Sequence, residues 1–340
     1  MKKLMTITGA SAIAAVTFGL NGAALAQEIQ LRFADQLPLT HIASAAGNQP
    51  FMEQVEAETD GRVTFRHFPA EQLAKGASML DTVQNGVSEI AFVGVSYVSD
   101  RLPLTGAVEL PGLFDNVIDG HAAFEALVRN ELADTFEQAG LKPLWTMTTP
   151  PYQLMLRQSE PIEGLADLSG QQLRVAGATG QLVAAALGAT PATIPTADLY
   201  QSLERGIVDG SLYTLSAMRS YTLQEVTQSY TTNAKLGGVA FIAFMNLNTW
   251  NSLPADVQEV IERVGLETGV NLAQAIDVTE VETVTFLEEM GKTVYPLSAE
   301  TVAEFDAALA TVQDEWARQM AERNLPGQEM LDAFAAYLAE

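Results

Sequence analysis

Residues 165–210 have the sequence LADLSGQQLRVAGATGQLVAAALGATPATIPTADLYQSLERGIVDG. The first apolar segment, Leu173 to Ala176, predicts a short strand, and Gly177 follows at once. A small-residue helix, a strand around Ile194 and a helix beginning at Thr196 complete the pattern of one α/β unit. Because such units bind ligands at the carboxyl ends of their strands, we expect functional side chains where the first strand ends.

Arg174 is the charged residue of this strand. Its planar guanidinium can donate two parallel hydrogen bonds to a carboxylate, so it is suited to a small organic acid. An isolated arginine is nevertheless more often a solvated surface residue. The residues around Arg174 therefore decide between an anion site and an ordinary surface cation.

The chain begins with two lysines, an apolar run from Ile7 to Leu20, and Ala24-Leu25-Ala26. A basic start, a short hydrophobic centre and an A-x-A site predict a secretory signal peptide over residues 1–26, cleaved near Ala26. The run is interrupted by polar residues and is shorter than the ~20 apolar residues of a membrane span. We therefore expect a soluble protein that is exported to the periplasm.

The formal charge of the chain is -24 at pH 7, and loss of Lys2 and Lys3 with the signal peptide changes it to -26, because no acidic residue precedes Gln27. So acidic a chain repels nucleic acid and anionic lipid. An anionic ligand is not excluded, since one local arginine in a dry site outweighs distant, screened carboxylates. The chain has no cysteine, which excludes disulfides and thiolate metal sites.

Apolar strands alternate with helical segments along most of the chain, and this alternation predicts parallel sheets. The 340 residues exceed what one ordinary core contains, so two lobes are expected. Thr148-Thr149-Pro150-Pro151 is the clearest linker between them. Helices are predicted, among others, at residues 118–138, 255–290, 299–320 and 329–338.

The sequence offers little for catalysis or metal binding. Its three histidines, His41, His67 and His121, lie in different predicted elements without metal-ligand spacing. Neither a nucleophile elbow nor a Gly-rich phosphate loop is present. We therefore predict no catalytic residues, no metal and no cofactor, and a binding protein instead of an enzyme.

The residues around Arg174 resemble the DctP-type substrate-binding proteins of tripartite ATP-independent periplasmic (TRAP) transporters. The resemblance covers nearly the whole chain after the signal peptide. The matching residues are Leu168, Gly170, Leu173, Arg174, Gly188, Ala189, Pro191, Ile194, Pro195, Tyr200, Leu203, Gly206 and Val208-Asp209-Gly210, together with Phe68 to Leu73, Val83 to Gly86 and Glu109 to Phe114.

The resemblance implies a two-lobed α/β fold of the periplasmic binding protein (Venus-flytrap) type, with a mainly parallel sheet flanked by helices in each lobe. The long helix at residues 255–290 is expected to brace both lobes. Hinges are expected at Thr148 to Pro151 and at Gly237-Gly238. The expected division is lobe I, residues 27–150 and 238–275, and lobe II, residues 151–237 and 276–340 with the C-terminal helices.

The resemblance also assigns roles to candidate binding residues. Arg174 matches the family's carboxylate-binding arginine. Many relatives have a second arginine near the linker, but here Gln153 or Leu154 takes that place and Arg157 is out of register. This departure argues against a dicarboxylate ligand. Tyr213 falls where some relatives have an asparagine beside the ligand, and it can supply both a ring face and a hydroxyl.

Further candidates occupy other positions of the expected cleft. Gln36, Val93 and Gly94 stand at strand ends of lobe I that line the cleft in relatives. The remaining candidates are Thr196, Ser216 and Lys235.

One arginine, few other charges and an added aromatic suggest a monocarboxylate with an apolar or aromatic body. The resemblance implies that closing lobes bury this acid and that a TRAP membrane permease then receives it. We expect a monomer that binds no nucleic acid. Two alternatives remain open: a ligand-sensing periplasmic protein with the same pocket, and an exported α/β hydrolase.

Overall fold

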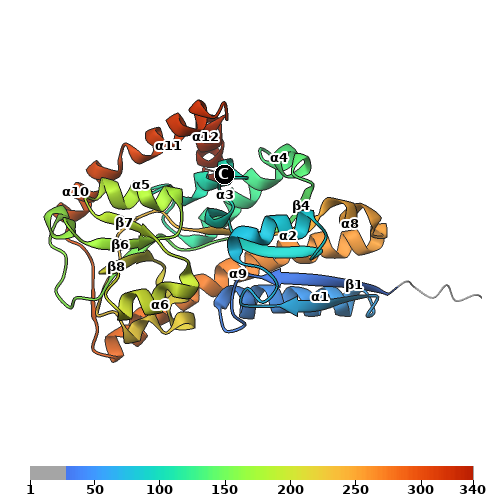
Figure 1. The fold of residues 1–340 in the computed structure, drawn as a ribbon, viewed down its shortest axis with the longest axis horizontal. Coiled ribbons are helices and arrows are strands. Elements are labelled where there is room, and N and C mark those ends of the chain that lie inside the picture. Colours follow the sequence, from blue (N-terminus) through green and yellow to red (C-terminus); the bar gives the residue numbers. More distant parts are fainter. Residues whose placement is uncertain (1–27, 340) are drawn as a thin grey trace, which may run out of the picture.

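The computed structural model describes residues 28–339, which form two β-sheets flanked by helices (Figure 1). The predicted signal peptide lies outside the described residues. We call the sheet that contains β1, with its helices, lobe I, and the sheet that contains β6, with its helices, lobe II. In Figure 1 lobe I lies on the right and lobe II on the left. The predicted two-lobed α/β fold is confirmed.

The sheet of lobe I has five strands in the order β2-β1-β3-β10-β4. β1 is parallel to β2 and β3, whereas β10 is antiparallel to β3 and β4. The bounds are β1 Ile29–Asp35, β2 Val63–Phe68, β3 Ile90–Gly94, β4 Leu141–Thr148 and β10 Ala240–Asn246. The late strand β10 thus completes a sheet whose other strands come from the first part of the chain.

The sheet of lobe II has six strands in the order β11-β9-β5-β8-β6-β7. β5 is antiparallel to β8 and β9, and the other neighbours are parallel. The bounds are β5 Gln153–Leu156, β6 Gln172–Val175, β7 Thr190–Thr193, β8 Gly210–Tyr213, β9 Ser229–Thr231 and β11 Thr293–Tyr295. Each sheet is therefore mainly parallel with one reversed strand.

Helices cover both sheets (Figure 1). Their bounds are α1 Gln49–Glu58, α2 Met79–Gln84, α3 Val117–Arg129, α4 Ala133–Gln138, α5 Ala178–Ala186, α6 Thr196–Glu204, α7 Leu215–Met218, α8 Leu247–Ser252, α9 Ala255–Glu289, α10 Ala299–Leu309, α11 Val312–Glu322 and α12 Gly327–Leu338.

The 35-residue helix α9 connects the lobes. It contacts α1, α3 and β4 of lobe I, and α7 and β11 of lobe II. A Cβ on Gly265 would lie 2.5 Å from the carbonyl oxygen of Leu144, so glycine permits the close approach of α9 to β4. The prediction of a long helix that braces both lobes is confirmed (Figure 1, orange).

Two segments predicted as single helices are split. α3 ends at Arg129 before α4 begins at Ala133, and α10 ends at Leu309 before α11 begins at Val312. The single-helix predictions were wrong because the buried residues keep helical spacing across both breaks. They are Val128, Leu132 and Phe136 in the first case, and Phe305, Leu309, Val312 and Trp316 in the second. The last helix, α12, packs against α3 of lobe I.

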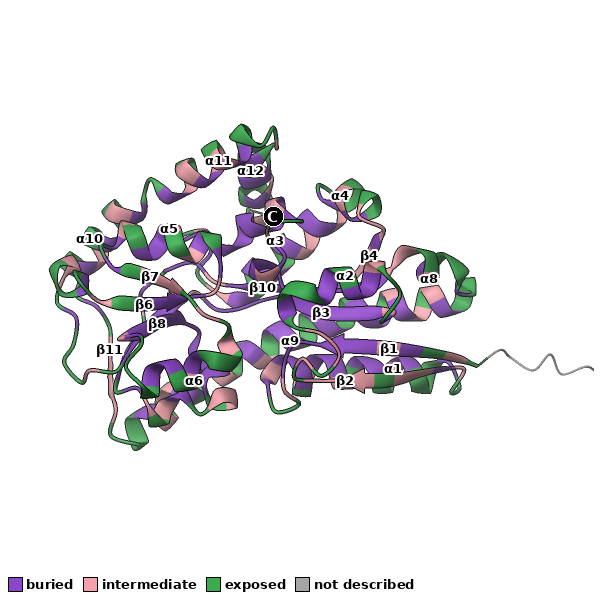
Figure 2. Cartoon of the chain, viewed as in Figure 1, coloured by how far each residue is buried: buried purple, intermediate pink, exposed green. Residues whose placement is uncertain are grey.

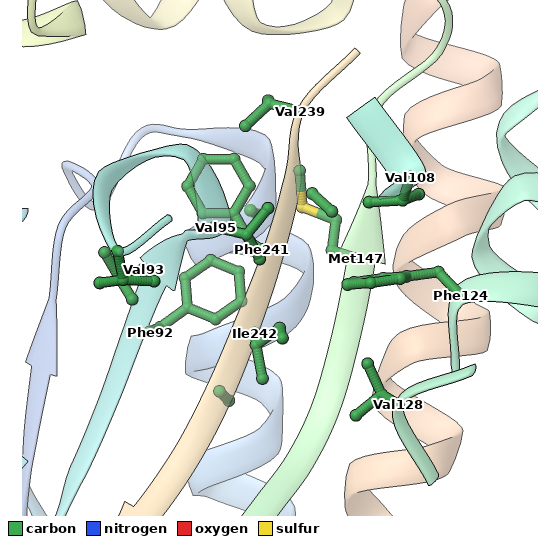
Figure 3. Close-up of a cluster of buried hydrophobic side chains, with 14 of the residues drawn as sticks. Phe92, Val93, Val95, Val108, Phe124, Val128, Met147, Val239, Phe241 and Ile242 are labelled. Atoms are coloured by element: carbon green, nitrogen blue, oxygen red, sulfur yellow. The ribbon is translucent and has the colours of Figure 1, made fainter. Parts of the chain in front are cut away.

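The buried apolar side chains form a large cluster that extends through both lobes and a smaller cluster in lobe II. Figure 2 shows buried residues in the strands and helices of both lobes. Around β3 and β10, Phe92 and Phe241 stack with ring centroids 5.3 Å apart (Figure 3). All five residues of β3 are buried. Within residues 28–339, no helix combines the length and the apolar character that a membrane crossing requires.

Candidate functional site

Arg174 lies in β6, between β7 and β8, and is fully buried. Its Nε donates a hydrogen bond to the carbonyl oxygen of Ile194 (2.8 Å), and its Nη2 donates to Oγ1 of Thr196 (2.8 Å). Its Nη1 is sealed from solvent and has no hydrogen-bond partner among the described residues. Because an unpaired buried donor on a charged group is costly, this nitrogen indicates a site for an acceptor.

The backbone at the end of β6 brings Arg174 to the seam between the lobes. β6 ends at Val175, and Gly177 precedes α5. A Cβ on Gly177 would lie 2.9 Å from Cβ of Ser96, which belongs to lobe I. Glycine therefore allows the two lobes to meet at the carboxyl end of the strand, where the sequence predicted a ligand site.

A cavity at this seam is lined by both lobes. The lining residues are Leu37, His41, Tyr97, Val239 and Phe241 of lobe I, Ala176, Thr196, Tyr213, Thr214, Ala217 and Tyr221 of lobe II, and Thr149 and Tyr152 between β4 and β5. Within the described part of the chain, this lining contains no Asp, Glu, Lys or Arg. Arg174 lies behind the lining, against Thr196 and Tyr213. The cavity is thus largely apolar and aromatic, with a buried cation behind one wall.

Aromatic rings shape the cavity. The rings of Tyr152 and Tyr213 stack with centroids 6.3 Å apart and planes 20° apart. The guanidinium carbon of Arg174 lies 5.8 Å from the centroid of Tyr213. Across the seam, His41 contacts Tyr221 edge-on at 5.9 Å. Flat aromatic walls with a nearby cation suit a planar organic anion.

The lobes hydrogen-bond to each other beside the cavity. The backbone N–H of Thr196 donates to the hydroxyl of Tyr97 (3.0 Å), and the two hydroxyl oxygens are 3.3 Å apart. Ser220 Oγ donates to the carbonyl oxygen of Thr40 (3.3 Å). Since Thr196 also accepts a hydrogen bond from Arg174, one residue contacts both the facing lobe and the buried cation.

Burial controls the ionisation of the groups around the seam. It raises the pKa of Tyr152 and Tyr213, although nearby Arg174 opposes the rise, so both tyrosines stay protonated. It lowers the pKa of His41 to about 4. It also raises the pKa of Glu109 to about 8, while the hydrogen bond from Ser96 Oγ acts in the opposite direction. At neutral pH these neighbours leave the charge of Arg174 uncompensated.

Two predicted site residues, Thr196 and Tyr213, line the cavity together with Arg174 behind it. Gln36 lines a neighbouring groove that shares Tyr97, Thr196 and Tyr221 with the cavity. The Oε1 atom of Gln36 accepts a hydrogen bond from the backbone N–H of Gly94 (3.0 Å). Gln36 and Gly94 therefore hold the ends of β1 and β3 together beside the cavity.

Gln153 and Ser216 lie outside the cavity lining. Gln153 Oε1 accepts hydrogen bonds from Oγ1 of Thr231 and the backbone N–H of Ala234, both at 2.9 Å. The backbone N–H of Ser216 donates to Glu280 of α9 (2.6 Å). These two residues connect neighbouring segments of the fold, and Glu280 links α9 to the segment that contains Thr214 and Ser216.

Val93 and Lys235 also lie outside the lining. The side chain of Val93 is 1% exposed and belongs to the hydrophobic cluster of lobe I (Figure 3). Nζ of Lys235 lies 2.5 Å from Asp115, and both side chains are exposed. Lys235 is thus a paired surface cation in this structure.

Several lining residues were absent from the sequence-based candidates: His41, Tyr97, Tyr152, Tyr221 and Phe241. For Tyr97 a signal existed, because it follows an apolar strand and so stands at a carboxyl strand end. Tyr152 likewise follows the predicted linker. His41 and Tyr221 belong to irregular segments without a shared motif, and they meet only across the seam. Within residues 28–339, no group of three or more potential metal ligands occurs.

A cavity between two α/β lobes, with a buried cation behind its wall, is typical of a ligand-binding protein. The family model for DctP, bacterial extracellular solute-binding proteins of family 7, matches residues 33–319. The chain belongs to this family, whose members include the substrate-binding proteins of TRAP transporters.

Curated relatives support the assignment over nearly the whole chain. A solute-binding protein of Roseobacter denitrificans is 26% identical over 328 residues, covering 93% of this chain and 97% of the relative. The C4-dicarboxylate-binding periplasmic protein DctP of Rhodobacter capsulatus is 27% identical over 347 residues, covering 99% of this chain and 98% of the relative.

Solved structures of TRAP solute-binding proteins share the fold. One from a marine metagenome, described as specific for aromatic acid ligands and solved with 3-hydroxybenzoate, has a TM-score of 0.86 and 26% identity, with 92% of this chain and 98% of that chain covered. One from Rhodoferax ferrireducens, solved with copurified benzoate, has a TM-score of 0.85 and 23% identity, with the same coverage.

Proposed function

We propose that this TRAP solute-binding protein captures an aromatic monocarboxylate between its lobes and delivers it to a membrane permease. The observation that carries the proposal is the sealed, unpaired Nη1 of Arg174 behind an aromatic cavity. A movement of the lining that exposes Nη1 would let a ligand carboxylate accept its hydrogen bond and supply the missing partner, and the tyrosine rings enclose the aromatic body. In this role the protein binds and releases its ligand without catalysis.

The cavity favours one carboxylate over two. Its lining has no second cation within the described residues, and Lys235 is paired with Asp115 on the surface. Overall similarity does not make this choice, because a relative 27% identical is named for C4-dicarboxylates and a structure 26% identical is described as specific for aromatic acids. The proposal therefore rests on the chemistry of the cavity.

Closure of the lobes would remove water from around the ion pair, and a charged hydrogen bond strengthens as water leaves. We place the hinges at Thr148 to Pro151 and at Gly237-Gly238, at the proposed lobe boundaries. Gly237 has a φ of +80°, and a Cβ there would collide with the carbonyl oxygen of Glu109. The protein acts as a monomer after removal of its signal peptide near Ala26.

A thermal-shift screen of the purified protein tests the ligand class. Benzoate and phenylacetate at a hundred times their Kd should each stabilise the folded state by about 2.7 kcal/mol, which raises Tm by several degrees. Succinate and malate should leave Tm unchanged. Stabilisation by the dicarboxylates alone would overturn the proposal.

A further inference from the structure

Four polar atoms of the cavity lining have no hydrogen-bond partner among residues 28–339. They are Nε2 of His41 and the hydroxyls of Tyr152, Tyr213 and Tyr221. His41, Tyr152 and Tyr213 are buried and Tyr221 is partly buried, yet the four atoms themselves remain accessible to solvent. A ligand that displaces water from the cavity must satisfy those of the four atoms that it covers.

The hydrogen bonds of His41 identify its tautomer. Its Nδ1 accepts the backbone N–H of Ala43 at 3.1 Å, so Nδ1 carries no proton. Burial lowers the pKa of His41 to about 4, against the weaker attraction of Asp35. A neutral ring with a bare Nδ1 carries its proton on Nε2. His41 thus presents one uncharged N–H donor to the cavity.

The surroundings of His41 hold this donor in place. The ring is 3% exposed and makes its edge contact with Tyr221 of the other lobe. Asp35 does not compete for the proton, because its carboxylate already accepts hydrogen bonds from Leu37, Ser44, Asn48 and His67. A rigid donor of this kind imposes geometry on whatever it binds.

We propose that His41 determines specificity by donating its Nε2–H to a hydroxyl on the aromatic body of the ligand, so that the substrate class is hydroxylated aromatic monocarboxylates. This inference rests on the proposed function, in which Arg174 binds the carboxylate. The two ends of the ligand are thereby held by different lobes, the carboxylate by lobe II and the hydroxyl by lobe I.

A hydroxyl fits these groups better than a second carboxylate. It accepts from Nε2 of His41 and donates its own proton to a tyrosine oxygen, so both partners are satisfied. A second carboxylate would face neutral donors and no cation of the lining, and a buried unpaired charge is strongly unfavourable. Aromatic dicarboxylates should therefore be rejected.

Two variants of His41 distinguish the hydrogen-bonding roles of its two ring nitrogens. His41→Asn keeps an acceptor near the position of Nδ1 for the N–H of Ala43 but removes the donor at Nε2. His41→Gln places an amide N–H near the position of Nε2 and so restores the donor. A purely structural role would depend on the Ala43 contact and would rank these variants in the opposite order.

Calorimetry with benzoate, the ortho-, meta- and para-hydroxybenzoates and isophthalate provides the test. For the unmodified protein, at least one hydroxybenzoate should bind about tenfold more tightly than benzoate, and isophthalate should bind more weakly than benzoate. His41→Asn should abolish the hydroxyl preference, measured as the ratio of hydroxybenzoate to benzoate affinity within each variant, and His41→Gln should retain most of it.

A hydroxyl preference that persists in His41→Asn, or no preference in the unmodified protein, would overturn the assignment of His41. In either case, tight binding of benzoate itself would leave the proposed function standing. If no aromatic monocarboxylate binds at all, the proposed function fails instead. The Tm of each variant, measured without ligand, confirms that the comparison is made on folded protein.

Discussion

The two faces that meet at the cavity differ in charge. Lobe II contributes Arg174, a buried guanidinium with one unpaired nitrogen. Lobe I contributes His41 and Glu109, and burial keeps both neutral at pH 7, because their pKa values move to about 4 and about 8. Although the chain has a formal charge of -24, the lining of the cavity within residues 28–339 contains no Asp or Glu. The acidic protein can bury an anion because the face opposite its arginine is neutral.

Removing the cation should have the largest effect. Arg174→Ala leaves a buried ligand carboxylate without its partner, a loss that typically costs ~3–5 kcal/mol. Calorimetry with benzoate should show affinity reduced by more than about a hundredfold. Arg219→Ala is a matched control, since Arg219 is exposed and lies over Phe286, outside the cavity lining. Equal affinities of the two variants would contradict the charge difference between the faces.

Replacing the buried Glu109 by glutamine, which cannot ionise, should change how the free energy of unfolding depends on pH. Burial raises the pKa of Glu109 from 4.5 to about 8, so the folded protein keeps a proton that the unfolded chain has lost. Stability therefore falls as pH rises toward 8, by at most ~1.4 kcal/mol per pH unit, and the loss is complete above the folded pKa.

Urea unfolding between pH 6.5 and 8 isolates this group, because His41 acts in the opposite direction and only below its ordinary pKa of 6.5. Unmodified protein should lose about 2 kcal/mol more than Glu109→Gln across this window. Parallel pH profiles of the two proteins would show that Glu109 is already ionised in the folded state.

Weakening the hydrogen bond between Tyr97 of lobe I and Thr196 of lobe II should have the smallest effect on ligand binding. Tyr97→Phe removes the hydroxyl that accepts the N–H of Thr196 and keeps the ring, which fills the space above Gly76 and Gly94. Loss of one such hydrogen bond costs about 1 kcal/mol, so ligand release should accelerate about fivefold. Stopped-flow fluorescence measures this rate.

Tyr200→Phe is the control for this variant. The hydroxyl of Tyr200 donates to Glu225 on the exposed surface (3.0 Å), away from the seam. Release that accelerates equally in both variants would mean that the contact between Tyr97 and Thr196 does not hold the closed form.

The strands and helices were largely predictable from sequence because they depend on local patterns, whereas the two-lobed fold was expected mainly from the family resemblance. Alternating apolar segments predicted the strands, and continuous helical spacing predicted α9 with its end one residue from the observed Glu289. The same rule failed at residues 130–132 and 310–311, where the chain breaks the helix but buried residues keep their spacing. Apolar periodicity reports which face is buried and not where a helix is interrupted.

The cavity was less predictable. Arg174 stood out because one charged residue interrupts an apolar strand at its carboxyl end. The partners of Gln153 could not be read from sequence, because Thr231 and Ala234 are distant in the chain and satisfy its amide within lobe II. The aromatic wall was missed because Tyr97, Tyr152 and Tyr221 come from separate segments of the sequence that are brought together only by the fold.

The most direct test of the account is a crystal structure of the protein with benzoate. The account predicts one carboxylate oxygen within hydrogen-bond distance of Nη1 of Arg174, with the ring enclosed by the tyrosines of the cavity. Benzoate bound away from this seam, or a carboxylate that leaves Nη1 of Arg174 unpaired, would contradict it.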